Sequence, residues 1–237
     1  MGFVPRPRRV GVIRARQGLF GANTPWKRVR FRRGPPEVAR LIEELGVGFL
    51  FAPQHHSAMK HAIGPRKALG LRTLFNLLGP LTNPALAPNQ VLGVFAAPLV
   101  RPIAEVMEKL GSRHVMVVHS SDGLDEISPA APTHVAELKD GAITEYQLDP
   151  AEFGQVAENL DALIVSDAAG SLAIIESVLA GDAGPGHAIV ALNAGAAIYV
   201  SGQADSLAEG IARASEILYQ GRALERLRQY AKRSQGL

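Results

Sequence analysis

The sequence predicts an α/β fold, in which a layered, largely parallel sheet is flanked by helices. Short apolar runs typical of buried strands alternate with stretches of helical spacing along residues 38–165. Helices between strands return the chain to the same edge of a sheet, which favours parallel pairing. A length of 237 residues, 47% of them apolar, is enough for one large domain or two small ones with a sizeable core.

The first elements follow from spacing and from turn residues. The apolar residues of 38–45 have helical spacing and are followed by Gly46, which predicts a helix that ends there. The apolar run at 48–51 predicts a buried strand, and the segment 55–69 predicts a second helix. Residues 74–84 are rich in Gly, Pro and Asn, so we expect a long irregular loop.

The pattern is more regular between residues 91 and 230. Asp140 and Gly141 separate two alternating runs, which is a strong signal for a β-hairpin. After residue 167 the apolar residues recur at helical spacing, and Asp205 is placed as an N-cap. The expected elements are strands at 91–97, 115–119, 134–138, 143–148 and 162–165, a helix at 100–110, and helices after 167 that end with a shorter one at 224–230.

Charge is unevenly distributed along the chain. Residues 1–34 contain ten of the 25 basic residues and none of the 22 acidic ones, although the net charge of the whole chain is only +3. We therefore expect two parts, a basic and irregular N-terminal segment at 1–34 and an α/β domain at 35–237. Three interpretations of the segment stay open: a nucleic-acid arm, a transit peptide, and a coding accident caused by a shifted reading frame. Nucleic acid is the less favoured partner.

Composition excludes several classes of protein. Without Cys there is no disulfide framework, no thiol nucleophile and no Cys-based metal site. The most apolar C-terminal stretch, 189–200, is interrupted by Asn193 and is too short to cross a bilayer. The N-terminus lacks the continuous apolar run of a secretory signal. We expect a cytoplasmic protein with no membrane partner.

Three clusters of residues could carry chemistry, and the first lies at 55–67. Three His, two Lys and one Arg follow the predicted strand here, among them His55, His56 and Arg66. Basic groups at the carboxyl end of a strand suit an anionic ligand, whereas a solvated helix face is the structural alternative. Metal binding by His55 and His56 is less favoured, since adjacent residues on a helix point in different directions.

The second cluster is the loop at 75–84, which combines Gly, Pro and Asn with apolar side chains. Such a loop is not typical of a solvated connector. It suits either the wall of a pocket for a flat apolar substrate or a rigid loop packed against the body, and composition leaves both open.

The third cluster follows the predicted strand 115–119 and contains Asp122, Asp125 and Glu126. Three carboxylates this close repel each other unless a cation is present, and Mg²⁺ is usually held by one or two carboxylates together with substrate phosphates. Gly123 allows a sharp turn, so that Asp125 and Glu126 can converge. An acidic loop in solvent is the alternative.

Four segments together resemble the anthranilate phosphoribosyltransferase family. They are the segments 48–61 and 66–84, Gly-Leu-Asp-Glu-Ile-Ser at 123–128 and Asn-Ala-Gly-Ala-Ala-Ile-Tyr-Val at 193–200. The resemblance implies a large domain like that of nucleoside phosphorylases and phosphoribosyltransferases. It also implies transfer of a phosphoribosyl group from phosphoribosyl pyrophosphate (PRPP) to anthranilate, giving N-(5-phosphoribosyl)anthranilate and pyrophosphate in tryptophan biosynthesis.

The resemblance also implies roles for residues on the anthranilate side. Arg66 would pair with the anthranilate carboxylate, which suits the forked donors of a guanidinium. Pro80 would help to wall the aromatic ring. His55 and His56 would flank the entrance for the substrate.

For the metal, the resemblance implies that Asp125 and Glu126 hold Mg²⁺ on the pyrophosphate group of PRPP. No side chain is implied as a catalytic nucleophile, since the amine of anthranilate displaces pyrophosphate at the anomeric carbon. Rate would then come from positioning and from neutralised charge on the leaving group.

The sequence also departs from the family pattern. The family's N-terminal helical domain, its Gly-Thr-Gly-Gly-Asp loop and the other segments that cradle PRPP have no counterpart in the 237 residues. Two alternatives therefore stay open: a catalytically inactive fragment that binds anthranilate or a partner, and a related enzyme like the pyrimidine-nucleoside phosphorylases. The family dimerises largely through the helical domain, so a homodimer is an open expectation.

Overall fold

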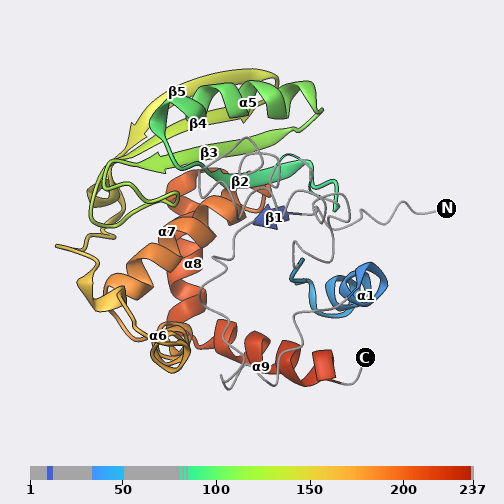
Figure 1. Cartoon of the computed structure of the whole chain (residues 1–237), viewed down its shortest axis with the longest axis vertical. Coiled ribbons are helices and arrows are strands. Elements are labelled where there is room, and N and C mark those ends of the chain that lie inside the picture. The colour runs from blue at the N-terminus through green and yellow to red at the C-terminus, as the bar shows by residue number, and fades with distance from the viewer. Residues whose placement is uncertain (1–9, 13–33, 51–80, 82, 84, 236–237) are drawn as a thin grey trace, which may run out of the picture.

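The computed structural model describes residues 10–12, 34–50, 81, 83 and 85–235. Within this part of the chain, a five-stranded sheet lies between helix α5 (Val100–Lys109) on one face and helix α7 (Pro185–Val200) on the other (Figure 1). Helix α8 (Leu207–Tyr219) packs against α7 as a further layer. The layered α/β fold expected from the sequence is confirmed.

The sheet is mixed, and its strands are ordered β1-β2-β3-β4-β5. The first three strands run parallel and the last two are antiparallel to their neighbours. The strands are β1 (Val10–Val12), β2 (Asn89–Gly93), β3 (His114–Ser120), β4 (Thr133–Lys139) and β5 (Ala142–Leu148). Parallel pairing is thus limited to the β1–β3 half of the described sheet.

The β4–β5 hairpin explains the antiparallel half. Only Asp140 and Gly141 connect the two strands, and a two-residue link can join only antiparallel neighbours. Both residues have positive φ, 52° and 78°, as the primed turns of tight hairpins require. The hairpin predicted from Asp-Gly is confirmed.

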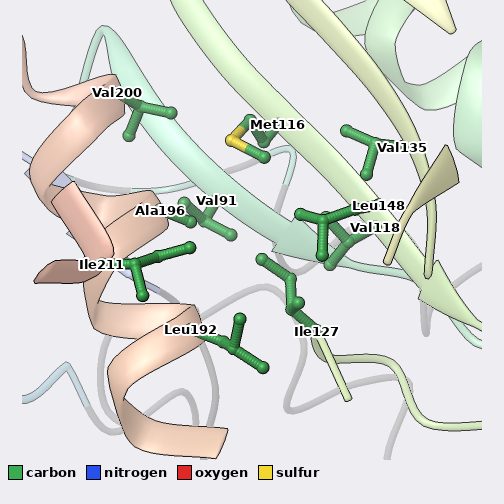
Figure 2. Packing of buried hydrophobic residues seen from close by; sticks show 10 residues of the cluster. All are labelled: Val91, Met116, Val118, Ile127, Val135, Leu148, Leu192, Ala196, Val200 and Ile211. Carbon is green, nitrogen blue, oxygen red and sulfur yellow. The ribbon is translucent and has the colours of Figure 1, made fainter. Parts of the chain in front are cut away.

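The core lies on both faces of the sheet, because side chains alternate along each strand. Met116 and Val118 of β3 join the cluster under α7, whereas Val115 and Val117 join the cluster under α5. Figure 2 shows the first cluster, where Leu192 of α7 faces the sheet residues. A shift of one residue in the register of β3 would exchange the two sets, so the register is strongly fixed.

Close contact between two glycines sets the distance between α7 and α8. A Cβ added to Gly195 would lie 2.4 Å from the Cα of Ile211, and one added to Gly210 would lie 2.4 Å from the carbonyl oxygen of Gly195. Neither position can hold a larger residue unless the helices move apart. Gly195 and Gly210 therefore set how closely α7, the helix that carries polar residues toward the sheet, packs against α8.

The remaining helices are α1 (Pro35–Leu45), α6 (Ala168–Ala180) and α9 (Arg222–Gln235). Helix α1 packs on α9 through Leu41 and Tyr230, and Glu44 forms an ion pair with Arg233. Short 3₁₀ helices lie at Ala97–Leu99, Pro150–Phe153 and Asp161–Leu163. Among the described residues, none of the helices has the length and apolar character needed to cross a bilayer.

Two predicted strands are wrong. Residues 48–50 are not in a strand, and Phe49 instead packs against the cluster between α1 and α9, where its backbone N–H donates to the Tyr230 hydroxyl at 3.3 Å. Helix–helix packing therefore accounts for the apolar side chain of Phe49. The segment 162–165 begins in the 3₁₀ helix Asp161–Leu163 and pairs with none of the described strands.

Smaller differences concern the termini of elements. Residues 10–12 were expected to be irregular, but they form β1 and gain backbone pairing with β2. The N-cap of α8 is Ser206, whose hydroxyl accepts from the Glu209 N–H, and not Asp205. Helix α9 has 14 residues and α8 has 13, so the last helix is not the shorter one.

Candidate functional site

The structure brings two of the predicted site residues to the strand-end loop, which we define as residues 121–132 between β3 and β4. Asp125 and Glu126 both lie in it. The four residues expected on the anthranilate side lie outside the described residues: His55, His56, Arg66 and Pro80. The described part of the candidate site is therefore the part expected to bind the metal.

The strand-end loop lies on the carboxyl edge of the parallel strands. It follows Ser120, the last residue of β3, and it touches Gly93, the last residue of β2. A Cβ added to Gly93 would be only 1.7 Å from the carbonyl oxygen of Asp125. The absence of a side chain at Gly93 allows the loop to rest directly on the end of β2, the edge where open α/β sheets bind ligands.

Asp122 stabilises the loop from within. Its Oδ1 accepts from the Leu124 N–H at 3.1 Å, and its Oδ2 accepts from the Ser128 hydroxyl at 2.6 Å. Partial burial tends to raise the pKa of Asp122, but these hydrogen bonds outweigh it, so the pKa is lowered. Asp122 was one of three carboxylates considered for a cation, and the structure gives it the role of closing the turn.

Asp125 and Glu126 are the two carboxylates that the sequence analysis predicted to hold a metal. The Asp125 residue is 8% exposed and Glu126 is partly exposed. In the described ranges, no three His, Cys, Asp or Glu side chains gather closely enough to hold a metal ion. Carboxylates are ligands that suit Mg²⁺, which is usually bound by one or two of them together with substrate phosphates and water.

A residue that the sequence analysis did not assign to the site, Asn193 of α7, contacts the strand-end loop. Its Oδ1 accepts from the Ile127 N–H at 3.0 Å, and its Nδ2 donates to the Ile127 carbonyl at 2.8 Å. The available signal was a single polar residue inside the apolar stretch 189–200. That signal indicates a buried partner, but it does not say which one.

A pair formed by the buried His187 and the partly buried Ser215 lies elsewhere in the molecule. Nε2 of His187 and the Ser215 hydroxyl are 2.9 Å apart, and the His187 ring stacks on Tyr219. Burial lowers the pKa of His187, and in the described part of the chain its Nδ1 has no hydrogen-bond partner. Because no carboxylate of the described residues orients this imidazole, the pair lacks the third member of a hydrolase triad there.

The described residues also line a shallow cavity of about 260 Å³, formed by β4, β5 and the start of α5. None of its lining residues lies in the strand-end loop or in α7. Two of its lining residues, His134 and Val135, pair with residues near the carboxyl end of β3. Neither Asp125 nor Glu126 lines the cavity.

Fold and sequence define the class of protein. A model described as "Glycosyl transferase family, a/b domain" matches residues 28–224. The chain therefore belongs to the glycosyl transferase family and carries that family's α/β domain. The match begins within the basic segment, before the boundary that charge suggested at residue 34.

Individual relatives are more specific and bear out the resemblance drawn from the motifs. The chain is 60% identical over 195 residues to the anthranilate phosphoribosyltransferase of Thioalkalivibrio sulfidiphilus, a match that covers 82% of this chain. It is 59% identical over 197 residues to the enzyme of the same name from Saccharophagus degradans, with 81% of this chain covered. The chain spans only 58% of the length of either relative.

Solved structures agree. The anthranilate phosphoribosyltransferase of Thermus thermophilus matches with a TM-score of 0.81 and 42% identity, covering 87% of this chain and 61% of that one. The enzyme from Saccharomyces cerevisiae, solved in complex with PRPP and Mg, matches with a TM-score of 0.78 and 29% identity, covering 87% of this chain and 60% of that one. The same yeast enzyme has been solved in complex with 4-fluoroanthranilate.

Proposed function

We propose that this chain takes part in the transfer of a phosphoribosyl group from PRPP to anthranilate, in tryptophan biosynthesis. The observation that carries the proposal is 60% identity to an anthranilate phosphoribosyltransferase over 82% of the chain. The pair Asp125 and Glu126, at the carboxyl edge of the sheet, supports it. In this reaction the amine nitrogen of anthranilate forms a bond to the anomeric carbon of the ribose and releases a proton, and the bond from that carbon to pyrophosphate breaks.

Asp125 and Glu126 would hold Mg²⁺ on the pyrophosphate group. When bound there, Mg²⁺ supplies positive charge that stabilises the leaving pyrophosphate. The carboxylates of this chain would orient the pyrophosphate against the carboxyl edge of β2 and β3. A yeast relative of known structure that contains PRPP and Mg supports this assignment.

The anthranilate side of the proposal rests on residues outside the described part. We assign the carboxylate of anthranilate to Arg66, because a guanidinium presents paired donors to both oxygens. Pro80 would cover the ring, and His55 and His56 would flank the entrance. The yeast structure with 4-fluoroanthranilate supports binding of this substrate class by the family.

Domain organisation and cellular context complete the proposal. The basic segment 1–34 would be separate from an α/β domain at 35–237, and two copies of the protein would form a homodimer. We place the reaction in the cytoplasm, since a chain without Cys needs no oxidising compartment to fold.

A second candidate is binding of the substrates without turnover. The sequence alone left this candidate open, and the chain spans 58% of the length of its relatives. A coupled assay for phosphoribosylanthranilate, run beside calorimetry with anthranilate and with Mg²⁺–PRPP, separates the candidates. Turnover that is lost in Asp125→Asn supports the enzyme. Anthranilate binding that is lost in Arg66→Ala, without turnover, supports the second candidate, and binding of neither ligand overturns both.

A further inference from the structure

We propose that Asn193 is a positioning residue for the carboxylates Asp125 and Glu126. The inference rests on the metal role proposed above for these two residues. Helix α7 lies on a face of the sheet. Through Asn193 it holds the strand-end loop in the geometry that a metal–pyrophosphate ligand needs.

The contact between Asn193 and Ile127 is a matched pair of hydrogen bonds. The Asn193 amide accepts from the backbone N–H of Ile127 at 3.0 Å and donates to the carbonyl of the same residue at 2.8 Å. A neighbouring β-strand satisfies a residue in the same way, with one donor and one acceptor side by side. Asn193 therefore acts as a one-residue strand partner for the backbone directly after Glu126.

Helix stability does not explain an asparagine at this position. Asn is a poor residue for a helix interior, and its side chain competes for backbone groups. Nδ2 of Asn193 indeed also donates to the Ile189 carbonyl one turn earlier, at 2.9 Å. The rest of α7 around it is apolar or small, so the polar side chain is best explained by the loop it binds.

Ile127 is held by its side chain as well as by its backbone. The side chain is fully buried in the cluster formed by α7, α8 and the sheet. Figure 2 shows Ile127 between Leu192 of the helix and Val118 of β3. Neither the backbone nor the side chain of the residue after Glu126 is thus free to shift without loss of these contacts.

The carboxylate pair is also held at β2, through the peptide group that joins Asp125 to Glu126. There the carbonyl of Asp125 occupies the space that a side chain at Gly93 would fill, 1.7 Å from the position of a Cβ. The backbone of the pair is therefore held at two fixed points, by Gly93 at the peptide between the two residues and by Asn193 at the residue that follows them.

Such fixation matters for Mg²⁺ in particular. This ion demands near-ideal octahedral geometry. When its ligands are already held in place before it binds, less conformational entropy is lost on binding. Groups that orient metal ligands typically change metal affinity about 10-fold to 100-fold when they are mutated. We expect the same range for Asn193, although it touches neither metal nor substrate in the proposed site.

The test measures Mn²⁺ binding to the full 237-residue chain by electron paramagnetic resonance, in the presence of pyrophosphate. The variants are Asn193→Leu, which has nearly the same shape without the amide, and Asn193→Ala. Gly93→Ala moves the other fixed point and remains informative if Asn193→Leu does not fold. The matched control is Leu218→Ala, which removes a buried side chain from a cluster on another side of α7. Hydrogen exchange at the Ile127 amide reports the contact directly.

The expected result is affinity at least about 10-fold weaker in the folded Asn193 variants and in Gly93→Ala, with faster exchange at Ile127 and normal affinity in Leu218→Ala. Wild-type affinity in the folded Asn193 variants overturns the positioning role and leaves the metal assignment intact. Equal weakening in Leu218→Ala also overturns it, because general destabilisation then explains the loss. If the wild type itself binds no Mn²⁺ with pyrophosphate, the metal assignment and the positioning role both fall.

Discussion

Helix α7 makes polar contacts with the strand side of the molecule at two places, and the two differ in chemistry. Near its middle, Asn193 uses a neutral amide to bind the backbone of the strand-end loop. Near its C-terminal end, Tyr199 joins a network with side chains of the sheet: His114, Glu137, Lys139 and Tyr146. We call this second group the Glu137 network.

The Glu137 network consists of ionisable side chains that are partly or largely buried, apart from Lys139, which is exposed. Glu137 accepts from Tyr146 at 2.9 Å and lies 2.7 Å from Nε2 of His114, and both members of the His114–Glu137 pair have only 12% of their side chain exposed. Burial tends to raise the pKa of Glu137, but hydrogen bonds from His114, Tyr199 and Tyr146 outweigh it and the pKa is lowered. Burial, together with the nearby Glu137 charge, raises the pKa of Tyr146, which keeps this hydroxyl protonated as a donor.

Helix α7 serves two purposes, one through Asn193 and one through Tyr199. The amide of Asn193 does not titrate, so its bonds hold the strand-end loop in the same position at any ordinary pH. The Glu137 network depends on one ionised carboxylate, so its contribution to folding changes with pH. We expect mutations in the network to change mainly stability, and mutations around the loop to change mainly ligand binding.

The largest effect on stability is expected for Glu137→Ala. The change leaves the Tyr146 hydroxyl and the His114 ring without the carboxylate, and orphaned buried groups cost about 1–3 kcal/mol each. We expect the free energy of unfolding in urea to fall by about 2–3 kcal/mol. The exposed Glu145→Ala is the control, since its partner Arg101 is half exposed. If Mn²⁺–pyrophosphate binding fell along with stability, it would be wrong to assign stability to the Glu137 network and ligand binding to the strand-end loop.

The second prediction concerns pH. Because the pKa of Glu137 is lowered in the folded protein from 4.5, its contribution to stability is present above about pH 4.5 and is lost as pH falls through the folded pKa. Unfolding midpoints measured between pH 7 and pH 3 should decline in the wild type, and Glu137→Gln should decline less over the same window. Equal declines would show that Glu137 is not the group responsible.

Ser128→Ala tests the site region with a smaller change. The Ser128 hydroxyl donates to Asp122 at 2.6 Å and accepts from the Ala130 N–H at 3.0 Å. We expect a loss of about 1 kcal/mol in stability, and the pKa of Asp122 should rise toward 3.8 when measured by NMR titration of its carboxyl. Ser177→Ala, at an exposed Ser–Asp pair, is the control. An unchanged pKa of Asp122 would contradict the turn described here.

The smallest effect is expected for Lys139→Met. Nζ of Lys139 lies 4.9 Å from the centroid of the Tyr199 ring and donates to its hydroxyl at 3.1 Å, at the exposed edge of the network. An exposed cation–π contact is worth about 0.5–1 kcal/mol. A double-mutant cycle with Tyr199→Leu should give a coupling near the lower end of that range, and a coupling above about 2 kcal/mol would mean that the pair is more deeply desolvated than its exposure indicates.

Much of the described fold was predictable because it depends on local signals. The β4–β5 hairpin follows from Asp140 and Gly141, and helices α1 and α8 follow from the helical spacing of their apolar residues. The wrong strands at 48–51 and 162–165 have a common cause, since a short apolar run does not tell whether its partners are strands or helices. For Phe49 the partner is Tyr230, which lies 181 residues away in the sequence.

Spacing, turn residues and motifs are local, so the sequence alone was enough to predict the class of fold, the family resemblance and a metal role for Asp125 and Glu126. The packing of distant segments was needed to show that Gly93 contacts the peptide between these two residues and that Asn193 binds the residue after them. Asn193 is 66 residues from Ile127, and no local pattern encodes which backbone an amide will reach across that distance. Packing of α7 on the sheet, fixed by the buried apolar cluster, decides that contact and with it the place of the two carboxylates.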